Sequence, residues 1–306
     1  MKATTTLLGS AILLAMLGQP AHAFEWVDDE IGLSWGPTYA EPGVFSKDYP
    51  RGNQIEKFTV SVTHADGFQY GTNFFNIDIL ESGDQDPANN SPQGATEVYG
   101  VYRNVLSGNK ISGTTNFSWG PIADIGWETG FDLETKNTAF APDKRLIVFG
   151  PQFSLVIPSF LGGKDGFFNI SLHGEQEWNN NGFSHCNSIG VCGPPGGPVT
   201  FEPTFEMETG WSLPMPFTFF GYTVKFKGFA NLVAPKGPTG FGTPTKTEIL
   251  VHPKLMVDLG EVFHGDKDRL EAGVGFEYWY NKFGNDHNST PGSIQMTPLF
   301  LVSYKF

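Results

Sequence analysis

The amino-acid sequence predicts an all-β protein, built as a single twelve-stranded antiparallel barrel that crosses a membrane. Composition is the first observation behind this prediction: charged residues make up only 17% of the chain, aromatic residues 14%, and there are 38 Gly and 22 Pro. Aromatic side chains suit pleated surfaces, whereas Gly and Pro interrupt helices, so many strands broken by turns are favoured. The other two observations are the alternation of side chains along the strands and the alternation of long and short connections. A secreted soluble β-sandwich is the alternative.

The first 23 residues have the features of a secretory signal peptide. Lys2 supplies a positive charge, residues 7–17 are apolar, and residues 21–23 read Ala-His-Ala, a small-x-small cleavage site. The apolar stretch is about half of the roughly 20 residues that a membrane-spanning helix needs. We therefore expect cleavage after Ala23, a barrel domain over residues 24–306, and a location in the bacterial outer membrane.

Strand-like segments follow one another along the rest of the chain. An even number of strands is expected if both termini lie on the same side of the membrane. The twelve predicted segments cover residues 29–37, 55–65, 70–81, 96–106, 122–134, 145–157, 166–178, 200–212, 218–231, 247–259, 269–282 and 294–306.

Alternation is clearest in the last segment. Met296, Phe300 and Tyr304 share one face, while Thr297 and Lys305 share the other. Because successive side chains of a strand point to opposite faces, one face is expected against lipid and the other against the lumen. The closing Tyr-Lys-Phe also resembles the terminal aromatic signature of outer-membrane proteins. In the fourth segment the alternation does not decide which way Arg103 points.

Connection lengths support the barrel independently. The first, third and later odd-numbered connections are long: residues 38–54, 82–95, 135–144, 179–199, 232–246 and 283–293. The even-numbered ones are mostly short: residues 66–69, 158–165, 213–217 and 260–268, with 107–121 as the exception. Long outer loops and short periplasmic turns are the known asymmetry of these barrels. Outer-loop charges such as Asp84 and Asp86 are expected to be solvated.

Charge narrows the class of partner. The formal net charge is −13, which excludes nucleic acid as an expected partner because phosphate binding needs clustered Lys and Arg. An acidic lumen discourages anions and tolerates cations or neutral solutes. Small neutral solutes and outer-membrane lipid are therefore the expected partners, and no cofactor or metal is expected.

The two cysteines, Cys186 and Cys192, lie six residues apart. In an oxidising exported context they predict a disulfide that closes a small loop. Zinc binding by His185 and the two thiolates is the alternative, but it lacks the fourth ligand of a structural site.

Residues 64–78 resemble the early hairpin of the Tsx-type nucleoside-specific channel family. An Asn/Asp-aromatic-aromatic-x-x-Asp run of that family is matched by Asn73, Phe74, Phe75 and Asp78. Further similarity lies in residues 25–32, 221–231 and 300–306. The resemblance implies a monomeric twelve-stranded barrel with a narrow lumen, through which nucleosides diffuse past aromatic rings and polar groups.

Alternation then selects the side chains expected to line the lumen. Passage requires weak binding at several positions, because a tight site would trap the solute. A one-residue bulge would invert any of these assignments. The predicted lumen set is Lys57, Phe74, Asp78, Glu206, Glu208, Lys225, Lys227, Lys254, Glu271, Glu277 and Trp279.

Two other functions remain open. Lumen Lys and Glu side chains commonly pair with one another and plug the bore, which would make the barrel a scaffold for its outer loops or a surface receptor. An outer-membrane lipid hydrolase would need a Ser–His pair. His64, His173, His252 and His264 are present, but none belongs to a nucleophile motif such as G-x-S-x-G.

Overall fold

The computed structural model describes residues 24–181, 197–240, 242–263 and 265–306. The predicted leader and the predicted Cys186–Cys192 disulfide lie outside these residues.

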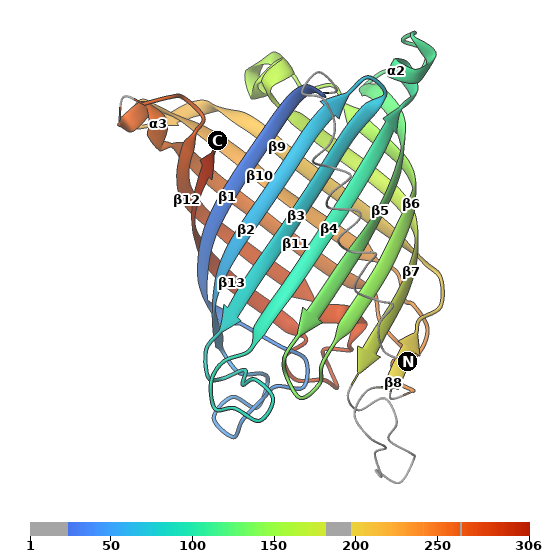
Figure 1. Ribbon diagram of the computed structural model, residues 1–306, viewed down its shortest axis with the longest axis vertical. Helices are drawn as coiled ribbons and strands as arrows, with labels where there is room; N and C mark the ends of the chain where they lie inside the picture. Colours follow the sequence, from blue (N-terminus) through green and yellow to red (C-terminus); the bar gives the residue numbers. More distant parts are fainter. Residues whose placement is uncertain (1–23, 182–196, 241, 264) are drawn as a thin grey trace, which may run out of the picture.

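Twelve long antiparallel strands form a closed barrel, which confirms the predicted fold (Figure 1). Consecutive strands pair with each other, and β1 pairs with β13, so the sheet has no open edge. A thirteenth strand, β8 (Gly197–Thr200), is short and pairs with the end of β7. The barrel strands are β1 (Phe24–Tyr39), β2 (Ile55–Phe68), β3 (Gly71–Ser82), β4 (Thr96–Ser107), β5 (Ile122–Lys136), β6 (Asp143–Leu155), β7 (Phe167–Asn181), β9 (Thr204–Phe219), β10 (Tyr222–Val233), β11 (Glu248–Asp258), β12 (Leu270–Tyr280) and β13 (Ile294–Lys305).

The predicted position of one turn was wrong. The segment 213–217, expected to be a connection, belongs to β9, and the chain turns at Phe220 and Gly221 instead. Both turn residues have positive φ (51° and 89°), as in tight two-residue hairpins. Pro214 and Pro216 suggested a break in the strand. In the structure, Pro214 is paired with Lys225 between β9 and β10, next to a register shift that can accommodate a proline.

The two ends of the barrel differ. One, called here the loop end, carries connections 40–54, 83–95, 137–142, 234–247 and 281–293, the last of which contains η3 (Lys282–Gly284). The other, the turn end, carries tight turns at 69–70 and 220–221 and three longer connections. These contain α2 (Gly108–Ser112), η1 (Ser159–Leu161) with η2 (Gly163–Asp165), and α3 (Leu259–Val262). In the described part of the chain, no helix is long and apolar enough to cross a bilayer.

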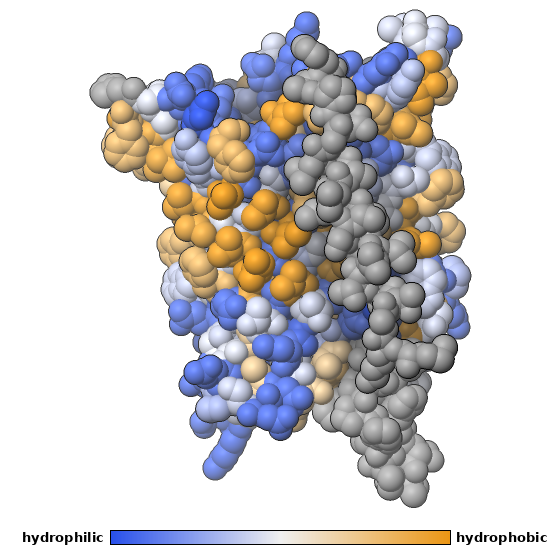
Figure 2. All heavy atoms as spheres, in the orientation of Figure 1, coloured by the Kyte–Doolittle hydropathy of each residue, from blue (hydrophilic) through white to orange (hydrophobic). Residues whose placement is uncertain are grey.

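Apolar side chains point outward around the wall. Leu33 on β1, Phe149 on β6, Val274 on β12 and Met296 on β13 are all exposed. Figure 2 shows a hydrophobic band between two hydrophilic ends on the viewed face. A soluble sandwich would bury such side chains, whereas a transmembrane barrel exposes them to lipid.

Candidate functional site: the barrel lumen

The ladder register places all eleven residues of the predicted lumen set on the inward face of the wall. On β3 and β4, for example, Phe74 pairs with Arg103 and Asp78 pairs with Tyr99. On β10 and β11, Lys227 pairs with Lys254. Whether any of these side chains binds a solute stays a prediction. Their surroundings divide the lumen into sections that differ in how fully the side chains are paired.

At the loop end, charged side chains from the wall and from three loops form one buried network, called here the loop-end cluster. Lys57 Nζ lies 2.6 Å from Glu41 Oε1 and 2.9 Å from Glu97 Oε2. Lys136 Nζ lies 2.8 Å from Asp86 Oδ2 and 3.3 Å from Glu41 Oε1. The cluster consists of Glu41, Lys57, Asp86, Glu97, Lys136 and Lys282.

Glu41 is the centre of this cluster. Burial alone would raise the pKa of Glu41, but the ammonium groups of Lys136, Lys282 and Lys57 hold that pKa well below its usual value of 4.5. Lys282 Nζ also donates to the backbone oxygen of Ala40 at 2.9 Å. The expectation that outer-loop charges are solvated was therefore wrong for Asp86, which is buried against Lys136. No local pattern separated Glu41 or Asp86 from ordinary loop acids.

Across the middle of the bore, Arg103 points inward. Its guanidinium contacts Asp132 on β5 (Nη1–Oδ1, 2.6 Å) and Glu208 on β9 (Nη2–Oε2, 2.8 Å). Because β9 is four positions from β4 in the wall, the second contact crosses the lumen. Phe74, opposite Arg103 on the neighbouring strand, therefore lies at a narrowed part of the bore.

Near the turn end, lysines and acids of the predicted set satisfy one another. Lys225 Nζ lies 2.6 Å from Asp268 Oδ1 and 2.9 Å from Glu271 Oε1. Lys227 pairs with the same Glu271 and lies 3.7 Å from Glu30. These side chains have the mutual pairing of a structural network, which leaves little of their hydrogen-bonding capacity for a solute.

Two more residues of the predicted lumen set, Trp279 and Glu277, form hydrogen bonds with neighbouring side chains. Trp279 donates its Nε1 hydrogen to Glu248 at 2.6 Å, and the ammonium of Lys282 lies 4.5 Å from the centre of the Trp279 ring. Glu277 accepts a hydrogen bond from Gln295 and lies 3.2 Å from His252 Nδ1. The Trp279 ring therefore contributes to packing at the loop end.

Three inward side chains of the predicted set are less fully paired than the others, and we call Phe74, Asp78 and Lys254 the open stretch. Phe74 is 40% exposed, although it lies on the inward face. Asp78 accepts a hydrogen bond from Ser61 Oγ at 2.5 Å and is partly exposed. Lys254 makes no hydrogen bond or ion pair with the residues that the structure describes. Since β3 and β11 are five positions apart in the twelve-stranded wall, these groups face one another from nearly opposite sides.

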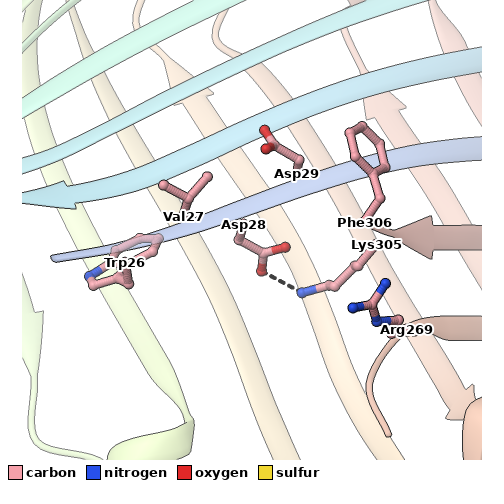
Figure 3. A pocket seen from close by; sticks show the side chains of 7 residues that line it. All are labelled: Trp26, Val27, Asp28, Asp29, Arg269, Lys305 and Phe306. Atoms are coloured by element: carbon pink, nitrogen blue, oxygen red, sulfur yellow. Dashed lines mark hydrogen bonds and ion pairs between the residues drawn. The ribbon is translucent and has the colours of Figure 1, made fainter. Parts of the chain in front are cut away.

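A cavity of about 340 Å³ lies at the turn end of the seam between β1 and β13 (Figure 3). Lys305 pairs with Asp28 there. The backbone nitrogen of Phe306 donates to the backbone oxygen of Asp29 at 3.1 Å. These contacts close the barrel, and they do not involve the open stretch.

The histidines do not assemble the Ser–His pair of a hydrolase within the described residues. His64 lies between Asp29 (Nδ1–Oδ1, 2.6 Å) and Asp66 (Nε2–Oδ2, 3.1 Å). No described histidine is hydrogen-bonded to a serine hydroxyl.

No protein-family model matches the chain, and no curated protein matches it. Among solved structures, the translocator domain of autotransporter NalP from Neisseria meningitidis is similar, with a TM-score of 0.47 and 12% identity over 97% of this chain and 95% of that one. The β domain of the Bordetella autotransporter BrkA has a TM-score of 0.40 and 7% identity, over 92% and 98%. OccK5 of Pseudomonas aeruginosa has a TM-score of 0.26 and 9% identity, over 92% and 98%.

Proposed function

We propose that this chain is an outer-membrane channel for the passive uptake of small solutes, with nucleosides as the first candidates. The observation that carries the proposal is the open stretch, where an accessible aromatic ring, a carboxylate and an ammonium group all lie on the inward face of the wall. The resemblance of residues 64–78 to the Tsx-type family supports the same substrate class.

The chemistry of the open stretch suits a nucleoside. The flat base can stack on Phe74, and base–aromatic stacking is worth about 1–3 kcal/mol in nucleic-acid complexes. Asp78 can accept hydrogen bonds from ribose hydroxyls, and Lys254 can donate to a ribose or base oxygen. Each contact is weak and separate from the next, which allows the solute to enter and to leave.

Location in the outer membrane follows from the same features. The closed wall satisfies its own backbone hydrogen bonds and exposes apolar side chains, as a membrane-spanning barrel requires. We assign the loop end to the cell exterior because long connections lie outside in this class of protein.

The test is planar-bilayer conductance of the refolded protein, titrated with thymidine or uridine and, as controls, with ribose and uracil. Saturable block by the nucleosides but not by the controls supports a selective channel. Conductance without any block contradicts nucleoside selectivity and leaves a general pore.

The loop-end cluster favours a second candidate, a plugged barrel that acts as a scaffold for its outer loops. Six buried charged residues join three loops to the wall there. If the folded protein shows no conductance, the scaffold replaces the channel as the proposed function.

A further inference from the structure

His173 is a deeply buried lumen residue with unsatisfied ring nitrogens. It projects inward from β7 and is only 1% exposed. Its Nε2 lies 3.4 Å from Glu128 Oε2, and its Nδ1 lies 3.9 Å from Glu206 Oε2. Within the described part of the chain, neither nitrogen has a hydrogen-bond partner, and Glu206 Oε2 lacks one as well. Buried polar groups in folded proteins are normally satisfied, so these atoms point to a missing partner.

The sheet itself brings two carboxylates next to this ring. His173 is paired directly with Glu206 in the ladder between β7 and β9, and Ser171 is paired with Glu208. Glu206 and Glu208 are two residues apart on one strand, so both point into the lumen. One ligand atom from each of His173, Glu206 and Glu208 can be chosen so that all three lie within 4.8 Å of one another.

The charges around the ring are unbalanced. Glu128, Glu206 and Glu208 lie near His173, and Asp132 joins them through Arg103, which is their cationic partner. Asp132 has a second cation nearby, because it accepts a hydrogen bond from Tyr99, whose hydroxyl accepts one from Lys144. Glu128, Glu206 and Glu208 are therefore three carboxylates that share the guanidinium of Arg103. A further positive charge is required there, either a proton on His173 or a bound cation.

We propose that His173, Glu206 and Glu208 bind a divalent transition-metal ion of the zinc class. Imidazole and carboxylate are ligands that zinc takes at about 2.0–2.2 Å, which places ligand atoms about 3.3 Å apart around a tetrahedral ion. The side chains reach that spacing by closing inward by about 1 Å. A divalent ion also balances the charges of Glu128, Glu206, Glu208 and Arg103.

The surroundings supply the other parts of a metal site. Glu128 faces Nε2 of His173, the nitrogen left over when Nδ1 binds the ion, and such a carboxylate orients a metal-bound histidine. Arg103 holds one oxygen of Glu208 and leaves the other for the ion. Glu208 borders the bore, with 23% of its side chain exposed, so the ion can enter from the lumen and keep a water ligand. This inference is independent of the solute that the channel passes.

The experiment uses the full-length protein, refolded in detergent and stripped of metal with a chelator. Co²⁺ is titrated while the visible absorption is followed, and Zn²⁺ is then added in competition. We expect one saturable site per chain, a visible band typical of nitrogen and oxygen ligands, and its loss on addition of Zn²⁺. If the folded wild-type protein shows no saturable binding up to about 1 mM Zn²⁺, the range of very weak affinity, the proposal is wrong. The positive charge at this place is then a proton on His173.

Variants locate the site. We expect His173→Asn and Glu206→Gln to weaken Zn²⁺ binding at least 100-fold, and Glu128→Gln to weaken it by about 10- to 100-fold. The matched control is His252→Asn, which removes another, partly buried lumen histidine that contacts Glu277 and the ring of Phe229. Binding in this control should be unchanged.

Heat-modifiable migration on gels shows whether each variant is folded. If His173→Asn does not fold, the partly exposed Glu208→Gln takes its place, with the same expected loss. Equal binding by wild type and by every folded variant would show that the metal binds elsewhere, and the assignment to His173 would be wrong.

Discussion

Nη2 of Arg103 lies 2.8 Å from Oε2 of Glu208, and this ion pair joins strands β4 and β9 across the bore. Asp132 holds the same guanidinium from the wall side at 2.6 Å. The barrel is therefore braced internally as well as by its ladder, and the brace narrows the lumen beside Phe74.

Removal of this brace should destabilise the protein and widen the pore. Arg103→Met leaves Asp132 and Glu208 without their cation, and loss of one partner of a buried ion pair costs about 3–5 kcal/mol. The free energy of unfolding in urea and the single-channel conductance measure the two effects. Arg145→Met is the control, because its pair with Asp143 is exposed and should be worth at most about 1 kcal/mol. Equal stability of the two variants would contradict the role of Arg103.

Phe74 should carry much of the nucleoside affinity. Phe74→Ala removes the accessible ring of the open stretch, and the loss of about 1–3 kcal/mol of stacking corresponds to about 5- to 150-fold weaker block of ion current. Phe75→Ala is the matched control, since it removes the same ring from the outward face of the same strand. Unchanged block in Phe74→Ala, or equal losses in both variants, would remove Phe74 from the proposed solute path.

Glu41 should control closure at the loop end. Glu41→Gln takes away the carboxylate that Lys57, Lys136 and Lys282 share, so these ammonium groups repel one another without it. We expect higher conductance and a lower unfolding temperature. Asp84→Asn changes an exposed acid of a neighbouring loop and should have neither effect. If Glu41→Gln conducts like wild type, the cluster does not close the pore.

Acidification should leave this closure intact over most of the acidic range. The pKa of Glu41 is held well below 4.5 in the folded protein, so its stabilising effect is fully present above the usual pKa. That effect is lost only as the pH falls through the lowered pKa. The conductance of the wild-type protein should therefore be the same at pH 7 and at about pH 5. If the conductance of the wild-type protein rises at pH 5 and that of Glu41→Gln does not, Glu41 is protonated at pH 5 and the prediction is wrong.

Features that neighbouring residues determine could be predicted from the sequence, whereas features that depend on distant residues could not. Alternation is set by neighbouring residues, and it placed all eleven predicted side chains, Lys57 and Glu271 among them, on the inward face. The turn at Phe220 and Gly221 was missed because Pro214 and Pro216 have the composition of a break. The ladder nevertheless accepts Pro214 beside a register shift, and only strand pairing reveals this.

The sequence by itself determined the fold class, the twelve strands and the two faces of the wall, because a period of two residues is a local property of an extended chain. Tertiary structure alone decided which inward side chains meet. Arg103 reaches Glu208 because strands β4 to β9 pair in order, and His173 faces two carboxylates because β7 pairs with β9 and β6. Glu41 reaches Lys282 because β1 pairs with β13 and closes the ring. Strand pairing decides which charges are paired and which are unsatisfied.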